Sequence, residues 1–181
     1  MNYATPAAQE TDILHFEHRI QINDSGNPLT ESPIEPLIEP ITHEQLWDGL
    51  VLRAEQPQLF VPGLSGCTIV ARTGNVLERE LHYGRVSVRD RVTLAPPHSV
   101  RYDIQPTEAY AGGSLTMTIE APDARQLFLR FEYQTTLPDT ADDEDTRQTI
   151  GIVKSAYYEA DKDTVRLIRQ LVQKHDQGTS R

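Results

Sequence analysis

The sequence contains a single cysteine, Cys67, so no disulfide can form within the chain. Long hydrophobic runs are also missing. No stretch approaches the roughly 18 apolar residues of a membrane-spanning helix, and no basic segment followed by an apolar block resembles a secretory signal. Lys and Arg number only 17 against 27 Asp and Glu, which gives a net charge of -10. These shortages predict a cytoplasmic protein without a membrane span, and they argue against nucleic acid as a partner, because nucleic-acid surfaces need clustered basic residues.

Motifs of cofactor chemistry are missing too. The sequence has no Gly-rich phosphate-binding loop, no Gly-x-Ser-x-Gly elbow and no Cys-x-x-Cys pair, so no cofactor is predicted. The histidines are scattered, and His15 and His18, the two closest in sequence, are expected on opposite faces of one strand. No metal site is predicted.

The length of 181 residues fits one domain. Both ends are polar, so we expect residues 1–12 and 173–181 to be flexible and a single domain to span residues 13–172. Proline density between residues 23 and 41 excludes a regular helix or central strand there, and we expect an extended loop packed on the body.

Alternation of apolar and polar residues predicts seven strands, at residues 14–22, 67–71, 76–83, 86–94, 100–104, 114–120 and 127–135. A first helix should begin after Thr42, whose spacing from Gln45 matches a capping box, and end at Pro57. A second should run from about Asp142 to Val172. This order predicts an α+β fold in which a curved antiparallel sheet wraps around a long C-terminal helix.

The hairpin of residues 76–94 is the most informative segment for a site. With a two-residue turn at Gly84-Arg85, Arg79 lies opposite Asp90 on the apolar face of the hairpin. Buried charges cost several kcal/mol each unless they are paired. The inward pair therefore predicts a lined, partly wet cavity, although the same pair could be purely structural and fix the strand register.

Other side chains on the predicted inner face could complete a site for a small molecule. The candidate ligand-binding residues are Arg79, Asp90, His18, Tyr83, Tyr102, Tyr133, Phe131, Met117 and Tyr157. Phenol and imidazole groups offer hydrogen bonds within apolar surface, although tyrosine and histidine also occur in ordinary cores. Lys154 and Asp161 lie at the edge of the helical apolar stripe, where charges are expected to be solvated.

Short segments spread over residues 13–172 carry a resemblance to a known family. They occupy residues 15–18, 44–47, 51–57, 60–63, 78–81, 88–92, 112–116 and 153–157. On these segments the chain resembles the AtaL-like family of the START-like, or SRPBCC, helix-grip superfamily. The resemblance implies a helix-grip fold and a hydrophobic pocket between the sheet and the C-terminal helix, which would bind a small hydrophobic or aromatic molecule.

Two further functions remain open. One is a polyketide cyclase or dehydratase, in which Asp90 or His18 takes a proton and Arg79 or a tyrosine steadies the developing enolate. The other is an interaction module whose pocket receives a segment of a partner protein. The sequence does not specify the ligand, the oligomeric state or whether a reaction is catalysed.

Overall fold

The computed structural model describes residues 13–23, 40–107, 112–123, 126–138 and 144–179. Within them, seven strands form one antiparallel sheet in the order β1-β7-β6-β5-β4-β3-β2. The elements are β1 (Ile13–Asn23), α1 (His43–Glu55), the short 3-10 helix η1 (Pro57–Leu59), β2 (Gly66–Thr73), β3 (Val76–Tyr83), β4 (Val86–Ala95), β5 (Ser99–Ile104), β6 (Gly113–Asp123), β7 (Gln126–Pro138) and α2 (Glu144–Thr179).

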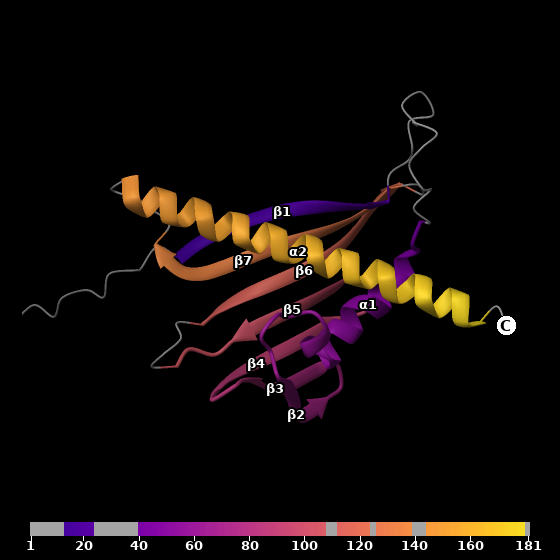
Figure 1. Cartoon of the computed structure of the whole chain (residues 1–181), viewed down its shortest axis with the longest axis horizontal. Helices are drawn as coiled ribbons and strands as arrows, with labels where there is room; N and C mark the ends of the chain where they lie inside the picture. Colours follow the sequence, from indigo (N-terminus) through magenta and orange to yellow (C-terminus); the bar gives the residue numbers. More distant parts are fainter. Residues whose placement is uncertain (1–12, 24–39, 108–111, 124–125, 139–143, 180–181) are drawn as a thin grey trace, which may run out of the picture.

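Both helices lie on one face of the sheet. Figure 1 shows α2 running along β1 and β7 and then crossing α1 toward its own C-terminal end. No described helix is long and apolar enough to cross a membrane. The arrangement confirms the predicted α+β helix-grip fold.

Local sequence signals explain where α1 begins and which face it buries. The Thr42 hydroxyl accepts a hydrogen bond from the Gln45 backbone N–H at 3.1 Å, and the Gln45 side chain accepts one from Thr42 N–H at 2.8 Å. This reciprocal pair is the predicted capping box. Leu46, Leu50 and Ala54 then follow at helical spacing and are fully buried against the sheet.

A glycine sets how closely the two helices cross. A Cβ atom on Gly49 of α1 would lie only 2.6 Å from Cγ2 of Ile168 on α2, closer than any side chain tolerates. Ile168 itself is buried. The missing side chain at Gly49 therefore lets the C-terminal part of α2 pack directly on α1.

The β3–β4 register agrees with the prediction, because Arg79 pairs with Asp90 and the chain turns at Gly84 with a φ of 61°. The strand predicted at residues 67–71 is present; Cys67 and Ile69 pair with the inward-facing Leu81 and Arg79 as predicted, but Ala71 pairs with the outward-facing Glu78. A bulge between Ile69 and Ala71 interrupts the alternation of β2, and Ile69 is 41% exposed.

The long helix α2 continues to Thr179, past the predicted end at Val172, so part of the segment expected to be flexible is helical. The N-terminal residues 1–12, the proline-rich residues 24–39 and the acidic residues Asp142 and Asp143 lie outside the described residues.

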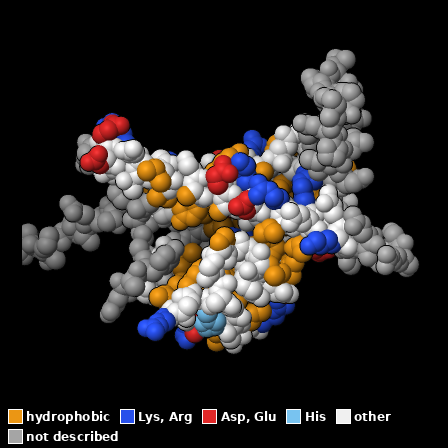
Figure 2. Space-filling view, in the orientation of Figure 1, with side chains coloured by type: hydrophobic (Ala, Val, Ile, Leu, Met, Phe, Trp, Pro, Cys, Tyr) orange, Lys and Arg blue, Asp and Glu red, His pale blue; other side chains and the backbone are white. Residues whose placement is uncertain are grey.

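The core occupies the space between the sheet and the helices, and Phe131, Met117 and Leu129 are fully buried in it. The strands at the other end of the sheet are less covered. Figure 2 shows the surface hollowed between α2 and the strands below it, with hydrophobic side chains on its walls.

Candidate functional site

The predicted pair Arg79 and Asp90 is buried, with 3% and 2% of its residue surfaces exposed. Arg79 Nε donates to Asp90 Oδ1 at 2.9 Å, and the Nη2 group binds Asp90 Oδ2. The remaining Nη1 group donates to the backbone carbonyl of Ala54, in the last turn of α1. Each guanidinium nitrogen is therefore used by the fold. This geometry favours the structural alternative, in which the pair joins the hairpin to the end of α1.

A second polar cluster lies between α2 and the sheet, centred on Asp161. The Tyr133 hydroxyl of β7 donates to the Asp161 carboxylate, and it lies 2.9 Å from Oδ1 and 2.8 Å from Oδ2. His18 Nε2 of β1 lies 2.9 Å from Asp161 Oδ2, although it does not align as a hydrogen bond. Asp161 is only 2% exposed, so the prediction of a solvated carboxylate was wrong. The reason is that this face of α2 packs on β1 and β7.

Burial controls the protonation of this cluster. It raises the pKa of Asp161 to about 7, even though the Tyr133 hydrogen bond and the positive charge of Arg53 favour the ionised form. Burial also lowers the pKa of His18, and burial together with Asp161 raises the pKa of Tyr133. Near neutral pH, Asp161 therefore exchanges a proton while Tyr133 stays neutral.

Arg53 of α1 provides a positive charge beside this cluster. Its guanidinium lies over the Tyr102 ring of β5, with Cζ 4.9 Å from the ring centroid, and it acts electrostatically on Tyr133 and Asp161. Arg53 Nε and the Tyr102 hydroxyl are both buried, and beyond the contact of these two side chains with each other they have no hydrogen-bond partner in the described part of the chain. No ion pair among the described residues involves Arg53. The Tyr102 hydroxyl can accept from Arg53, and its own proton has no acceptor among the described residues.

Aromatic rings surround the cluster. Phe16 stacks on Tyr133 with centroids 5.0 Å apart, and Tyr157 of α2 lies 4.5 Å from the same ring. His18 stacks on Phe131 at 5.3 Å. These contacts place polar groups within an apolar, aromatic wall, which is the usual composition of a small-molecule site.

The predicted site residues thus fall into three places. His18, Tyr133, Phe131 and Tyr157 come together at the Asp161 cluster, and Arg53 connects Tyr102 to it. Arg79 and Asp90 lie under the end of α1, and Arg79 Cζ lies 5.3 Å from the centroid of the Tyr102 ring. Met117 is fully buried in the core, and Tyr83 lies beside the β3–β4 turn, 36% exposed.

Sequence analysis missed Asp161 and Arg53 as site residues. A signal existed for each. Asp161 falls four residues after Tyr157 and seven before Ile168, on the packing stripe of α2, and Arg53 falls three residues after Leu50 of α1. A charge within such a stripe is buried if the helix packs closely, and that depends on the tertiary structure.

A separate groove of about 280 Å³ lies between the two helices. It is lined by Gln45, Asp48, Gly49, Leu52, Ile168, Leu171 and Val172, none of which belongs to the predicted ligand-binding set.

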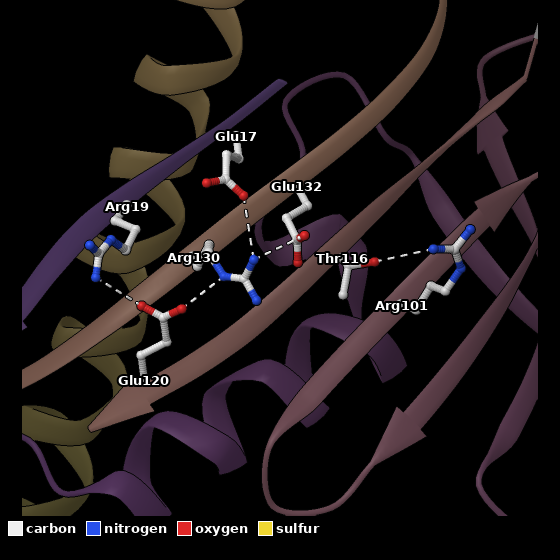
Figure 3. A network of polar contacts seen from close by, with 7 residues as sticks. All are labelled: Glu17, Arg19, Arg101, Thr116, Glu120, Arg130 and Glu132. Carbon is white, nitrogen blue, oxygen red and sulfur yellow. Dashed lines mark hydrogen bonds and ion pairs between the residues drawn. The ribbon is translucent and has the colours of Figure 1, made fainter. Parts of the chain in front are cut away.

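The opposite face of the sheet has a different character, because its charges neutralise one another. Figure 3 shows Arg130 between Glu17, Glu120 and Glu132, at distances of 3.4, 2.8 and 3.0 Å. Arg19 also binds Glu120, at 3.1 Å. These side chains are partly exposed and mutually paired, which fits a solvated face better than a binding site.

A curved antiparallel sheet that holds one long C-terminal helix over an aromatic and polar cluster defines the helix-grip class, which includes Bet v1-like and START-like proteins. The family model described as acetylaranotin biosynthesis cluster protein L, AtaL, matches residues 29–175, and the chain belongs to this family. The predicted resemblance is thereby confirmed. No curated protein matches the sequence.

Solved structures support the class. The di-domain ARO/CYC StfQ of the steffimycin biosynthetic pathway is similar with a TM-score of 0.63 and 11% identity, covering 93% of this chain and 53% of that one. This chain therefore spans about half the length of StfQ. The Zhui aromatase/cyclase from Streptomyces sp. R1128 is similar with a TM-score of 0.54 and 14% identity, covering 90% of this chain and 94% of that one. Ara h 8.0201 is similar with a TM-score of 0.54 and 12% identity, covering 90% of this chain and 99% of that one. At these identities the similarity establishes the fold alone.

Proposed function

We propose that the protein binds a small hydrophobic or aromatic molecule between the sheet and α2. The observation that carries this proposal is the incompletely paired polar cluster within an aromatic wall. Arg53 Nε and the Tyr102 hydroxyl are buried and have no hydrogen-bond partner among the described residues beyond their contact with each other. An unsatisfied buried donor costs about 1–3 kcal/mol, so a ligand oxygen that accepts from both would bind favourably.

The surroundings of the cluster suit such a ligand. Tyr133, Tyr157 and Phe16 offer aromatic surface, and Arg53 and His18 keep part of their side chains accessible to solvent. Few polar groups in an apolar cleft are enough to fix the orientation of a bound molecule. A ligand would enter through the hollow that lies between α2 and the strands in Figure 2.

The test is a titration with N-phenyl-1-naphthylamine, a neutral aromatic dye whose fluorescence rises in apolar surroundings. We expect saturable binding at one site. Leu115 lies between Tyr102 and Tyr133 in the sheet register and is buried on the inner face. Leu115→Trp should therefore fill the site and weaken binding by at least about tenfold.

Thr116→Trp is the matched control, because it adds the same ring at the next residue of β6, where the side chain points to the opposite face. Binding by this control should equal that of the wild-type protein. If Leu115→Trp lowers the unfolding temperature, Leu115→Phe repeats the test with less added volume. Binding that does not saturate, or that the folded Leu115 variants leave unchanged, would refute the proposal.

A second candidate function is a cyclase-type reaction, which the Asp161 carboxyl favours because its pKa of about 7 suits proton exchange at neutral pH. Ionised Asp161 would take a proton from the carbon beside a ketone, and Arg53 with Tyr102 would hold the enolate oxygen. The enolate carbon would then bond to a second carbonyl carbon of the same molecule. The oxygen of that carbonyl would receive the proton back from Asp161, so the step is a balanced isomerisation.

Incubation with aromatic polyketide-type ketones, followed for product, tests this candidate. Asp161→Asn should lower turnover by about 10²–10⁴-fold, the usual contribution of a general acid or base, while dye binding is retained. Saturable binding of such ketones without any product would contradict the cyclase-type function and leave the proposed binding function in place.

A further inference from the structure

The charges around the candidate site do not balance. Arg79 and Asp90 neutralise each other at the end of α1. Arg53 has no ion-pair partner among the described residues, and the Asp161 carboxylate acts on it electrostatically. The groups that face Asp161 are Tyr133 on β7, His18 on β1 and Arg53 on α1.

The protonation of Asp161 decides the net charge of this set. When Asp161 is ionised, it compensates Arg53 and the set is neutral, provided that His18 is neutral. When Asp161 holds a proton, the guanidinium remains as one uncompensated positive charge beside the buried Tyr102 hydroxyl, whose proton has no acceptor among the described residues. Such a site is electrostatically complementary to an anion.

We propose that the bound molecule is an aromatic or apolar acid, that its anionic oxygen lies against Arg53 and Tyr102, and that its binding is accompanied by proton uptake at Asp161. This inference rests on the proposed function and deepens it by naming the charge of the ligand. A ligand anion near Asp161 disfavours a second negative charge, so it stabilises the protonated carboxyl. The Tyr133 hydroxyl and the His18 imidazole can hydrogen-bond to either the ionised or the protonated form of Asp161, because both groups donate and accept hydrogen bonds.

The negative charge of the whole chain does not oppose the proposal strongly. Charges farther than about 8 Å are screened at physiological ionic strength. On the opposite face of the sheet, the carboxylates are already bound by Arg130 and Arg19 (Figure 3). The guanidinium of Arg53 is the buried positive charge beside the Asp161 cluster, whereas the Lys154 ammonium lies on an exposed residue over the Phe16 ring.

Two dyes separate the ligand charge from the ligand shape. The anionic dye 8-anilinonaphthalene-1-sulfonate and neutral N-phenyl-1-naphthylamine share one aromatic skeleton, and only the first carries a sulfonate. At about pH 6, where Asp161 is mostly protonated, the anionic dye should bind at least about tenfold more tightly. This preference should fall several-fold at about pH 8.5, because Asp161 is then ionised and must take up a proton from the solvent when the anion binds.

Variants assign the effect to named groups. Arg53→Gln should abolish the preference for the anion, whereas Arg53→Lys should retain most of it. Asp161→Asn should keep the preference and remove its pH dependence between about pH 6 and 8.5. The matched controls Arg89→Gln and Asp163→Asn alter exposed, ion-paired residues and should behave like the wild-type protein.

Calorimetry in buffers of different ionisation enthalpy gives an independent readout. The sulfonate does not titrate near neutrality, so any proton taken up on binding of the anionic dye belongs to the protein. We expect net uptake of a fraction of a proton at about pH 7–8, and none for Asp161→Asn.

The outcomes distinguish this inference from the proposed function. Tight binding of the neutral dye with no preference for the anion, or with the same preference in Arg53→Gln, would overturn the inference and leave the proposed function standing. Anion preference without proton uptake would also overturn it. Failure of both dyes to bind would overturn the inference and the proposed function together.

Discussion

At the scale of single residues, the structure assigns different roles to two buried carboxylates. Asp90 is bound by two nitrogens of Arg79, whereas Asp161 receives a phenol hydroxyl and lies near an imidazole. A fully paired carboxylate is a structural element, while a carboxyl whose pKa lies near 7 is available for proton exchange. The sequence predicted the first through its strand register and placed the second in solvent.

Asp161 should make stability depend on pH. Its pKa is about 7 in the folded protein and about 3.9 in an unfolded chain, so between these values the folded state holds more protons. Stability therefore decreases as pH rises from about 4 to 7, by up to roughly 4 kcal/mol from this group. Asp161→Asn should match the wild-type protein at about pH 4 and be the more stable of the two at about pH 8.

Urea unfolding at several pH values measures this difference, and Asp163→Asn provides the control because Asp163 is exposed and paired with Arg166. His18 has a lowered pKa and adds its own pH dependence below about 6.5. Because His18 contacts Asp161, the comparison is most direct above about pH 6.5, where His18 is neutral in both proteins. A constant difference between Asp161→Asn and the wild-type protein across this range would contradict the assignment.

Arg79 and Asp90 should matter for stability and not for ligand affinity. Arg79→Leu leaves Asp90 charged and buried without its partner, which should cost about 3–5 kcal/mol. Arg79→Leu combined with Asp90→Leu removes both charges and should be less destabilising than the single change. Denaturant unfolding checks the stabilities. A folded double variant that loses dye binding would show that the pair belongs to the site.

At the scale of secondary-structure elements, prediction succeeded where a local rule decides the geometry. The capping box at Thr42 and the two-residue turn at Gly84 depend on neighbouring residues only, and both are observed. Prediction failed at β2, where the bulge after Ile69 depends on how the edge strand meets β3. It also failed at Asp161, because burial of a helix edge depends on a distant strand.

The packing of α1 on α2 yields a prediction from two helical glycines. Gly49→Ala should gain about 1 kcal/mol of helix propensity and yet destabilise the protein, because the new Cβ would lie 2.6 Å from Ile168. Gly151→Ala in α2 meets no atom within 4 Å, so it should stabilise the protein by roughly 0.5–1 kcal/mol. Thermal unfolding of the two variants should therefore move in opposite directions; stabilisation by Gly49→Ala would show that the helices are not in close contact.

At the scale of the whole molecule, the candidate site combines residues of the sheet and of both helices, and no single element contains it alone. β1 and β7 supply His18 and Tyr133, α2 supplies Asp161, and α1 supplies Arg53. The sequence indicated the inner-face tyrosines and His18, since strand alternation is local. It could not place residues from two helices against those strands, because their meeting depends on the crossing of α1 and α2.

The central claim is that a ligand binds between the sheet and α2, beside the Asp161 cluster, and not in the groove between the helices. Nuclear Overhauser effects between methyl-labelled protein and bound N-phenyl-1-naphthylamine test it most directly. The account predicts contacts from the dye to Leu115 of β6, which lies between Tyr102 and Tyr133. Contacts instead to Leu52 and Leu171, which line the groove between α1 and α2, would contradict it.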